Sequence, residues 1–131
     1  MAYEIALLIG RVLFGGYFAF SGINHFLNAN SLTGWVESKG VPRAELAVYL
    51  SGLMLLAGGL GIAAGAYPVI SIALVGVFLA VVTPWFHDYW NMEGEDRQSH
   101  QTNFLKNMAL FGALLVMLSI NWTVYSLGMS L

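Results

Sequence analysis

Two histidines each follow a long apolar run, and this repeated placement is the first feature of the sequence that suggests chemistry. His25 closes the run that ends in "SGINHF", and His87 closes the run that ends in "PWFHDYW". A neutral imidazole can bind a metal, donate or accept a hydrogen bond, and carry a proton. The two histidines can act on one ligand only if their side chains lie close together.

More polar residues follow the same ends of the apolar runs. If the runs are antiparallel helices, the first and third end at one membrane face, and the fourth begins there. We therefore expect a polar pocket just under that face. Pro84 breaks the helical hydrogen bonds shortly before His87 and would direct that side chain inward. The residues expected in this pocket are Asn24, His25, His87, Asp88, Asn103, Lys106 and Asn107.

Three interpretations of this pocket stay open. Two neutral imidazoles could ligate a haem or another metal, although an axial pair usually lies deeper in a bundle. Histidines beside Asp88 and Lys106 could instead donate to the carbonyls of a quinone and relay a proton. In the third interpretation, the His and Trp side chains only bind water at the interface. His100 falls in a polar loop, where we expect it to be solvated.

A second polar cluster is expected inside the membrane. Arg11 lies well within the first apolar run, on one helical stripe with Glu4 and His25. An Arg near a helix centre costs about 2.5–3.5 kcal/mol, so a partner or a role is expected. Arg11 could pair with Glu4, or it could bind an anion or a polar headgroup. The predicted cluster is Glu4, Arg11, Ser119 and Asn121, the last two on the fourth helix at a similar depth.

Composition indicates that lipid surrounds these residues. The chain has 131 residues, of which 58% are hydrophobic and 9% charged, with a mean hydropathy of +0.71. Soluble domains are about 25% charged, and a chain this short cannot bury so much apolar surface in its own core. Cysteine is absent, which excludes disulfides and thiolate chemistry within the chain. The net charge of -2 and the lack of a basic run argue against nucleic acid.

Four apolar segments are each close to the ~20 residues that a helix needs to cross a bilayer. The start, "MAYEIALLIGR", has no positive leader, so we interpret the first segment as a retained membrane helix. The sequence predicts an all-α protein, a single integral membrane domain over residues 1–131 that forms a four-helix bundle of up-down-up-down topology. The predicted helices cover about 4–26, 44–65, 67–87 and 104–128.

The distribution of basic residues predicts an orientation. The two polar loops, 27–43 and 88–103, carry Lys39, Arg43 and Arg97. By the positive-inside rule, both loops face the cytoplasm, and both termini lie on the outer side of the cytoplasmic membrane. Trp and Tyr residues near both ends of the segments, Trp122 among them, are expected to form interfacial belts. Small residues such as Gly15 and Gly22 are expected at helix contacts.

With the spans placed, the chain resembles the DoxX family of small four-helix membrane proteins. The resemblance rests on "GRVLFGGYFAFSGINHF", "KGVP", "SGLMLLAGGLGIAAGAYP", "FHDYW" and "FLKNMALFGALL", in that order. It implies a bundle in the cytoplasmic membrane. Relatives include a subunit of thiosulfate:quinone oxidoreductase, and more distant ones resemble chaperones or cargo receptors. The positions that match the family pattern are Arg11, Gly22, His25, Pro42, Gly52, His87, Trp90, Lys106 and Asn107.

These observations support more than one function. The first hypothesis is a membrane subunit of a quinone-linked redox complex, with a quinone bound near His25, His87 and Lys106. Asn24, Asp88, Trp90 and Asn107 are the further candidate binding residues. The second is an assembly factor or structural subunit without a cofactor, which would bind a partner membrane protein, a redox protein or a second copy. A third, transport or lipid handling through Arg11, has less support because no inverted repeat is evident.

Overall fold

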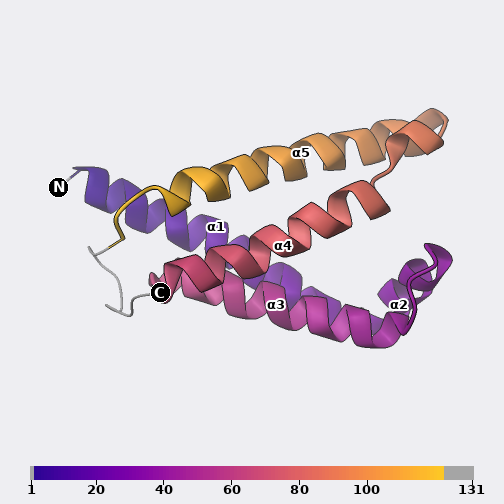
Figure 1. Cartoon of the computed structure of the whole chain (residues 1–131), viewed down its shortest axis with the longest axis horizontal. Coiled ribbons are helices and arrows are strands. Elements are labelled where there is room, and N and C mark those ends of the chain that lie inside the picture. Colours follow the sequence, from indigo (N-terminus) through magenta and orange to yellow (C-terminus); the bar gives the residue numbers. More distant parts are fainter. Residues whose placement is uncertain (1, 123–131) are drawn as a thin grey trace.

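The computed structural model of the chain describes residues 2–122, and every regular element in that range is a helix. Figure 1 shows each long helix running antiparallel to the long helix before it, joined by tight turns or short segments. The elements are α1 (Ala2–Leu27), α2 (Ala29–Ser38), α3 (Ala44–Ala64), α4 (Pro68–Phe86), a 3-10 helix η1 (Tyr89–Asn91) and α5 (Gly94–Leu118).

Neighbouring helices pack in a regular order. α1 packs on α3, α3 on α4, and α4 on α5, while the short α2 lies against α3. The beginning of α1 and the end of α5 lie at one end of the molecule, and α2 and η1 lie at the other end (Figure 1). The two segments expected as polar loops are therefore at the same end of the structure.

The helices have the length and surface of a membrane protein. Within residues 2–122, three spans are long and apolar enough to cross a bilayer: α1, α3 and the segment Pro68–Asn91 that contains α4. Only 28% to 39% of the residues in these spans are buried inside the chain. Leu13 and Phe20 on α1 are each 69% exposed. An apolar surface of this extent requires lipid or a partner around it.

The prediction of helix positions is close for three segments and wrong for the fourth. The fourth helix begins at Gly94 rather than near residue 104, and it ends at Leu118. The first turns are polar but contain good helix formers such as Glu95 and Gln98, so the helix extends beyond its apolar part. Residues 123–128 of the predicted helix lie outside the described chain. Loop 27–43 likewise contains a helix, α2. A membrane-crossing four-helix bundle stays a prediction.

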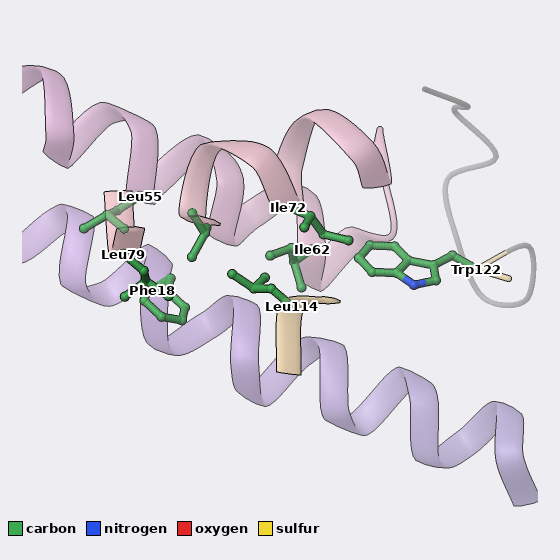
Figure 2. Packing of buried hydrophobic residues seen from close by; sticks show 8 residues of the cluster. Phe18, Leu55, Ile62, Ile72, Leu79, Leu114 and Trp122 are labelled. Atoms are coloured by element: carbon green, nitrogen blue, oxygen red, sulfur yellow. The ribbon is translucent and has the colours of Figure 1, made fainter. Parts of the chain in front are cut away.

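One apolar core holds the long helices together. It receives side chains from α1, α3, α4 and α5 and from the segment after α5, as Figure 2 shows. Its buried members are Phe18, Leu55, Ile62, Ile72, Val75, Leu79, Leu114 and Trp122.

Glycines bring α1 and α3 into backbone contact. A Cβ added to Gly15 would collide with the backbone oxygen of Gly59, and one added to Gly22 would lie 2.6 Å from the backbone oxygen of Gly52. No real Cβ tolerates such a distance, so only glycine permits this approach. The predicted helix contacts at Gly15 and Gly22 are confirmed. A pocket lies between the helices further along α1, and the contact of α1 with α3 fixes one of its walls.

Candidate ligand pocket at the α2 end of the helices

A pocket of about 390 Å³ opens between the helices, toward the end of the molecule where α2 lies. This volume is within the range of small-molecule sites, about 300–1,000 Å³. Its walls are mainly aliphatic and aromatic side chains from α1, α2, α3 and α4. The aromatic members are Tyr17, Phe18, Trp35, Phe78, Trp85 and Phe86.

Four of the predicted site residues line this one pocket: His25, His87, Lys106 and Asn107. They come from the ends of α1 and α4 and from the middle of α5, because α1 and α4 finish where the apolar part of α5 begins. Asn107 is 9% exposed, so its amide is buried at the pocket wall. The two histidines therefore line the same cavity. Each ring has a different hydrogen-bond partner.

The imidazole of His25 is held by its own helix. Its Nδ1 lies 2.9 Å from the backbone oxygen of Ser21, one turn earlier. Its ring meets the ring of Phe78 edge-on, with 5.9 Å between centroids. On the other side, a Cβ on Gly52 would lie 2.8 Å from the Cβ of His25. Gly52 thus allows His25 to sit directly against α3.

His87 pairs with a residue that sequence reasoning left in solvent. The Nδ1 atoms of His87 and His100 are 2.9 Å apart, so one ring donates a hydrogen bond to the other. The ring of Trp35 lies beside both, at centroid distances of 6.1 Å from His87 and 6.3 Å from His100. The expectation that His100 is solvated is wrong. Because α5 begins at Gly94, its second turn places His100 next to the end of α4.

An ion pair fastens the end of α2 beside the pocket. Lys39 Nζ donates to Asp88 Oδ1 at 2.8 Å, and both side chains are about one-fifth exposed. Trp85 Nε1 donates to the backbone oxygen of Lys39 at 3.1 Å. Asp88 also accepts from Asn91 at 3.1 Å. Asp88 therefore positions α2 at the pocket edge and is not itself among the lining residues.

Lys106 lies at the open side of the pocket. Its Nζ is 3.5 Å from the hydroxyl of Tyr17 and 3.4 Å from the side-chain oxygen of Asn103. It also lies 5.9 Å from the centroid of the Tyr17 ring. The side chain is exposed, so the ammonium can bind a ligand and still keep part of its contact with water.

The other residues predicted for this site lie outside the pocket lining. Asn24 is exposed and accepts a hydrogen bond from the side chain of Asn28, which lies between α1 and α2. Trp90 is half-exposed on η1 and packs edge-on against Tyr89 and Phe104. Neither residue borders the cavity, although both lie at the same end of the molecule.

The residues of the second predicted cluster lie where α1 begins and α5 ends. Arg11 is 1% exposed, and its guanidinium lies 5.7 Å from the centroid of the Trp122 ring, a cation–π geometry. Glu4 and Asn121 line a second, shallower cavity together with Tyr3, Leu7 and Ile120. Ser119 is outside that cavity and caps α5, with Oγ donating to the backbone oxygen of Val116 at 2.7 Å.

One expectation about this cluster is wrong. Ser119 and Asn121 do not lie on the fourth helix, because that helix ends at Leu118 and the chain then turns back. Trp122, expected in an interfacial belt, is 4% exposed and belongs to the apolar core. Its Nε1 donates to the backbone oxygen of Met117 at 2.9 Å, which satisfies the only polar atom of the ring. From the sequence, a Trp near a predicted helix end does not indicate that the helix has already ended.

The described residues contain no group of three or more His, Asp and Glu side chains placed to hold one metal ion. Nδ1 of His25 and Nδ1 of His87 are both already engaged in hydrogen bonds. What the pocket does offer is an apolar volume with polar groups that donate and accept hydrogen bonds at one end. Such a site suits an amphipathic ring compound.

Fold and surface thus define the class: an all-helical integral membrane protein with a pocket near one end of its spans. A family model described as DoxX matches residues 6–88, and the chain belongs to the DoxX family. Neither the curated proteins nor the solved structures contain a match to the chain. The matched range includes His25 and His87 and ends before Trp90, Lys106 and Asn107.

Proposed function

We propose that this protein is an integral membrane subunit of a quinone-linked redox complex, and that it binds the quinone head in the pocket. The observation that carries the proposal is the convergence of His25, His87, Lys106 and Asn107 on one apolar cavity. Aromatic side chains flank the volume in which a planar ring would lie. The proposed location is the cytoplasmic membrane, with the α2 end on the cytoplasmic side and both termini outside.

The residues of the chain would bind and orient the ring rather than transfer electrons themselves. Lys106 can only donate hydrogen bonds, and the amide of Asn107 can donate or accept them, so both suit a ring oxygen. The quinone would supply the electron-carrying chemistry, and a partner protein would supply or remove the electrons. The apolar walls exclude water from the ring, which strengthens each hydrogen bond.

Filling the pocket tests this proposal without altering a polar group. Ala47 lines the cavity, whereas its neighbour Leu46 is 57% exposed on the outside of α3. We expect Ala47→Phe to weaken binding of decylubiquinone at least about tenfold, because the ring occupies the ligand's volume. Leu46→Phe is the matched control and should bind like the wild type. Binding is measured by quenching of tryptophan fluorescence in lipid nanodiscs. Equal binding by all three proteins would contradict the proposal.

A second candidate function is an assembly or structural subunit that binds partner helices. It is favoured by glycines on outward helix faces: a Cβ added to Gly10, Gly16 or Gly112 would meet nothing within 4 Å. Such faces allow another helix, from a partner or a second copy, to approach closely. Native mass spectrometry of the protein released gently from its membrane separates the candidates. A retained quinone supports the first, and a retained polypeptide without a small molecule supports the second.

A further inference from the structure

The hydrogen bond of His25 locates one of its ring hydrogens. Nδ1 lies 2.9 Å from the backbone oxygen of Ser21, and a carbonyl oxygen can only accept. The hydrogen atom must therefore be on Nδ1. In the neutral ring, the other nitrogen, Nε2, then carries a lone pair and can only accept.

Nε2 is the polar atom that His25 has left to offer. It makes no hydrogen bond to any residue in the part of the chain that the structure describes, while His25 lines the pocket. The ring cannot easily turn to present Nδ1 instead. Phe78 lies against the edge of the His25 ring. The Cβ of His25 lies over Gly52, where α1 and α3 are in backbone contact. The pocket thus contains a fixed acceptor on α1.

The opposite chemistry comes from α5. Lys106 is a donor only, and it lies at the pocket's open side near Tyr17. A ligand that satisfies both groups needs a hydroxyl hydrogen for His25 and an oxygen lone pair for Lys106. A carbonyl satisfies Lys106 but leaves the lone pair of neutral His25 facing another lone pair, which is unfavourable in an apolar site.

We propose that His25 accepts a hydrogen bond from a ligand hydroxyl, so that the pocket prefers a phenolic head over the corresponding carbonyl or ether. This inference rests on the proposed function, and for a quinone it selects the reduced, hydroxyl-bearing form. The groups that carry it are the Ser21-bonded imidazole of His25, the ammonium of Lys106 and the aromatic walls between them.

A pair of probes tests the donor requirement without redox chemistry. Para-decylphenol and its methyl ether have nearly the same shape and apolar tail, and only the phenol has a hydrogen to donate. We expect the wild-type protein in nanodiscs to bind the phenol about tenfold more tightly than the ether, the ratio expected for one well-placed hydrogen bond in an apolar site. Decylubiquinol and decylubiquinone, compared under reducing and oxidising conditions, should show the same order.

Substitution of the imidazole assigns the preference to one residue. In His25→Phe the phenol-to-ether ratio should fall to about one, because the ring shape stays and the acceptor is lost. Asn24→Ala changes the neighbouring exposed residue and should keep the wild-type ratio. If His25→Phe does not fold, nitrogen NMR of the wild-type imidazole provides the second measurement. The hydrogen is expected on Nδ1 in the free protein, and the Nε2 signal should move when the phenol is added.

The outcomes separate this inference from the proposed function. If the phenol and the ether bind equally, and Ala47→Phe weakens both, the pocket binds ligands but the hydroxyl preference is overturned. If His25→Phe keeps the preference, the assignment to His25 is overturned. If no probe binds and decylubiquinone also fails to bind, both proposals fall together.

Discussion

The hydrogen bond between His87 and His100 requires that one of the two Nδ1 atoms carries a hydrogen and the other does not. Each histidine can be neutral in this arrangement, or one can be charged. Two protonated rings would place two positive charges face to face and remove the acceptor. The hydrogen bond between the two rings therefore depends on pH.

We expect the pair to make the folded state less stable in acid. Two positive charges on these rings would repel each other, because their Nδ1 atoms are only 2.9 Å apart. The folded chain then binds fewer protons than the unfolded chain, so the free energy of unfolding falls as the pH decreases through the usual histidine range near about 6.5. The stabilisation is present above that range and is lost below it.

His100→Phe is the variant that tests this expectation. It keeps an aromatic ring beside Trp35 and removes the hydrogen-bond partner of His87. Thermal unfolding in detergent, compared at about pH 7.5 and about pH 5, should show a larger loss of stability for the wild type than for the variant. The same pH dependence in both proteins would mean that the pair does not contribute.

At the scale of helices, glycines bring α1 and α3 into backbone contact. Gly15→Ala places a methyl group against the backbone oxygen of Gly59, and neither helix can yield without moving the other. We expect a loss of about 1–3 kcal/mol in the free energy of unfolding, the range for overpacked sites. Gly16→Ala is the matched control, because a Cβ there meets nothing within 4 Å.

The control should be neutral or slightly stabilising, since Ala replaces Gly within a helix. Unfolding in a denaturing detergent, followed by helical circular dichroism, measures both variants. If Gly15→Ala were as stable as Gly16→Ala, the backbone contact would be wrong. If binding of decylubiquinone also weakens in Gly15→Ala alone, the α1–α3 contact supports the pocket as well as the fold.

Hydropathy located α1, α3 and α4 well because their apolar runs coincide with the helices. It failed for α5 because a helix outside lipid needs no apolar residues, and "GEDRQSHQTN" continues the helix on the polar side. This error concealed the partner of His87. From sequence, His100 could be placed next to His87 only if the start of α5 were known.

Across the whole molecule, the site was more predictable than the polar contacts around it. The antiparallel order of the helices is enough to bring His25, His87 and Lys106 to one end, since it depends only on the apolar runs. The Lys39–Asp88 ion pair depends on how α2 folds, and the fold of α2 depends on packing against α3. Such contacts are decided by tertiary structure and leave no local pattern.

The absence of native cysteine makes the membrane orientation directly measurable. Ser38→Cys, Gln98→Cys and Tyr3→Cys each introduce one thiol at an exposed position near an end of the molecule. We expect a membrane-impermeant maleimide to label Ser38→Cys and Gln98→Cys from the cytoplasmic side and Tyr3→Cys from the other side. Labelling of Ser38→Cys and Gln98→Cys from opposite sides would contradict the proposed topology.

The glycine contact between α1 and α3 has a consequence for the order of assembly. Every residue that forms it lies before Gly65, so all of them leave the ribosome before α4 and α5 do. The wall that carries His25 can therefore exist first, and the later helices close the pocket against it. One wall of the pocket is thus encoded entirely in the half of the protein that is translated first.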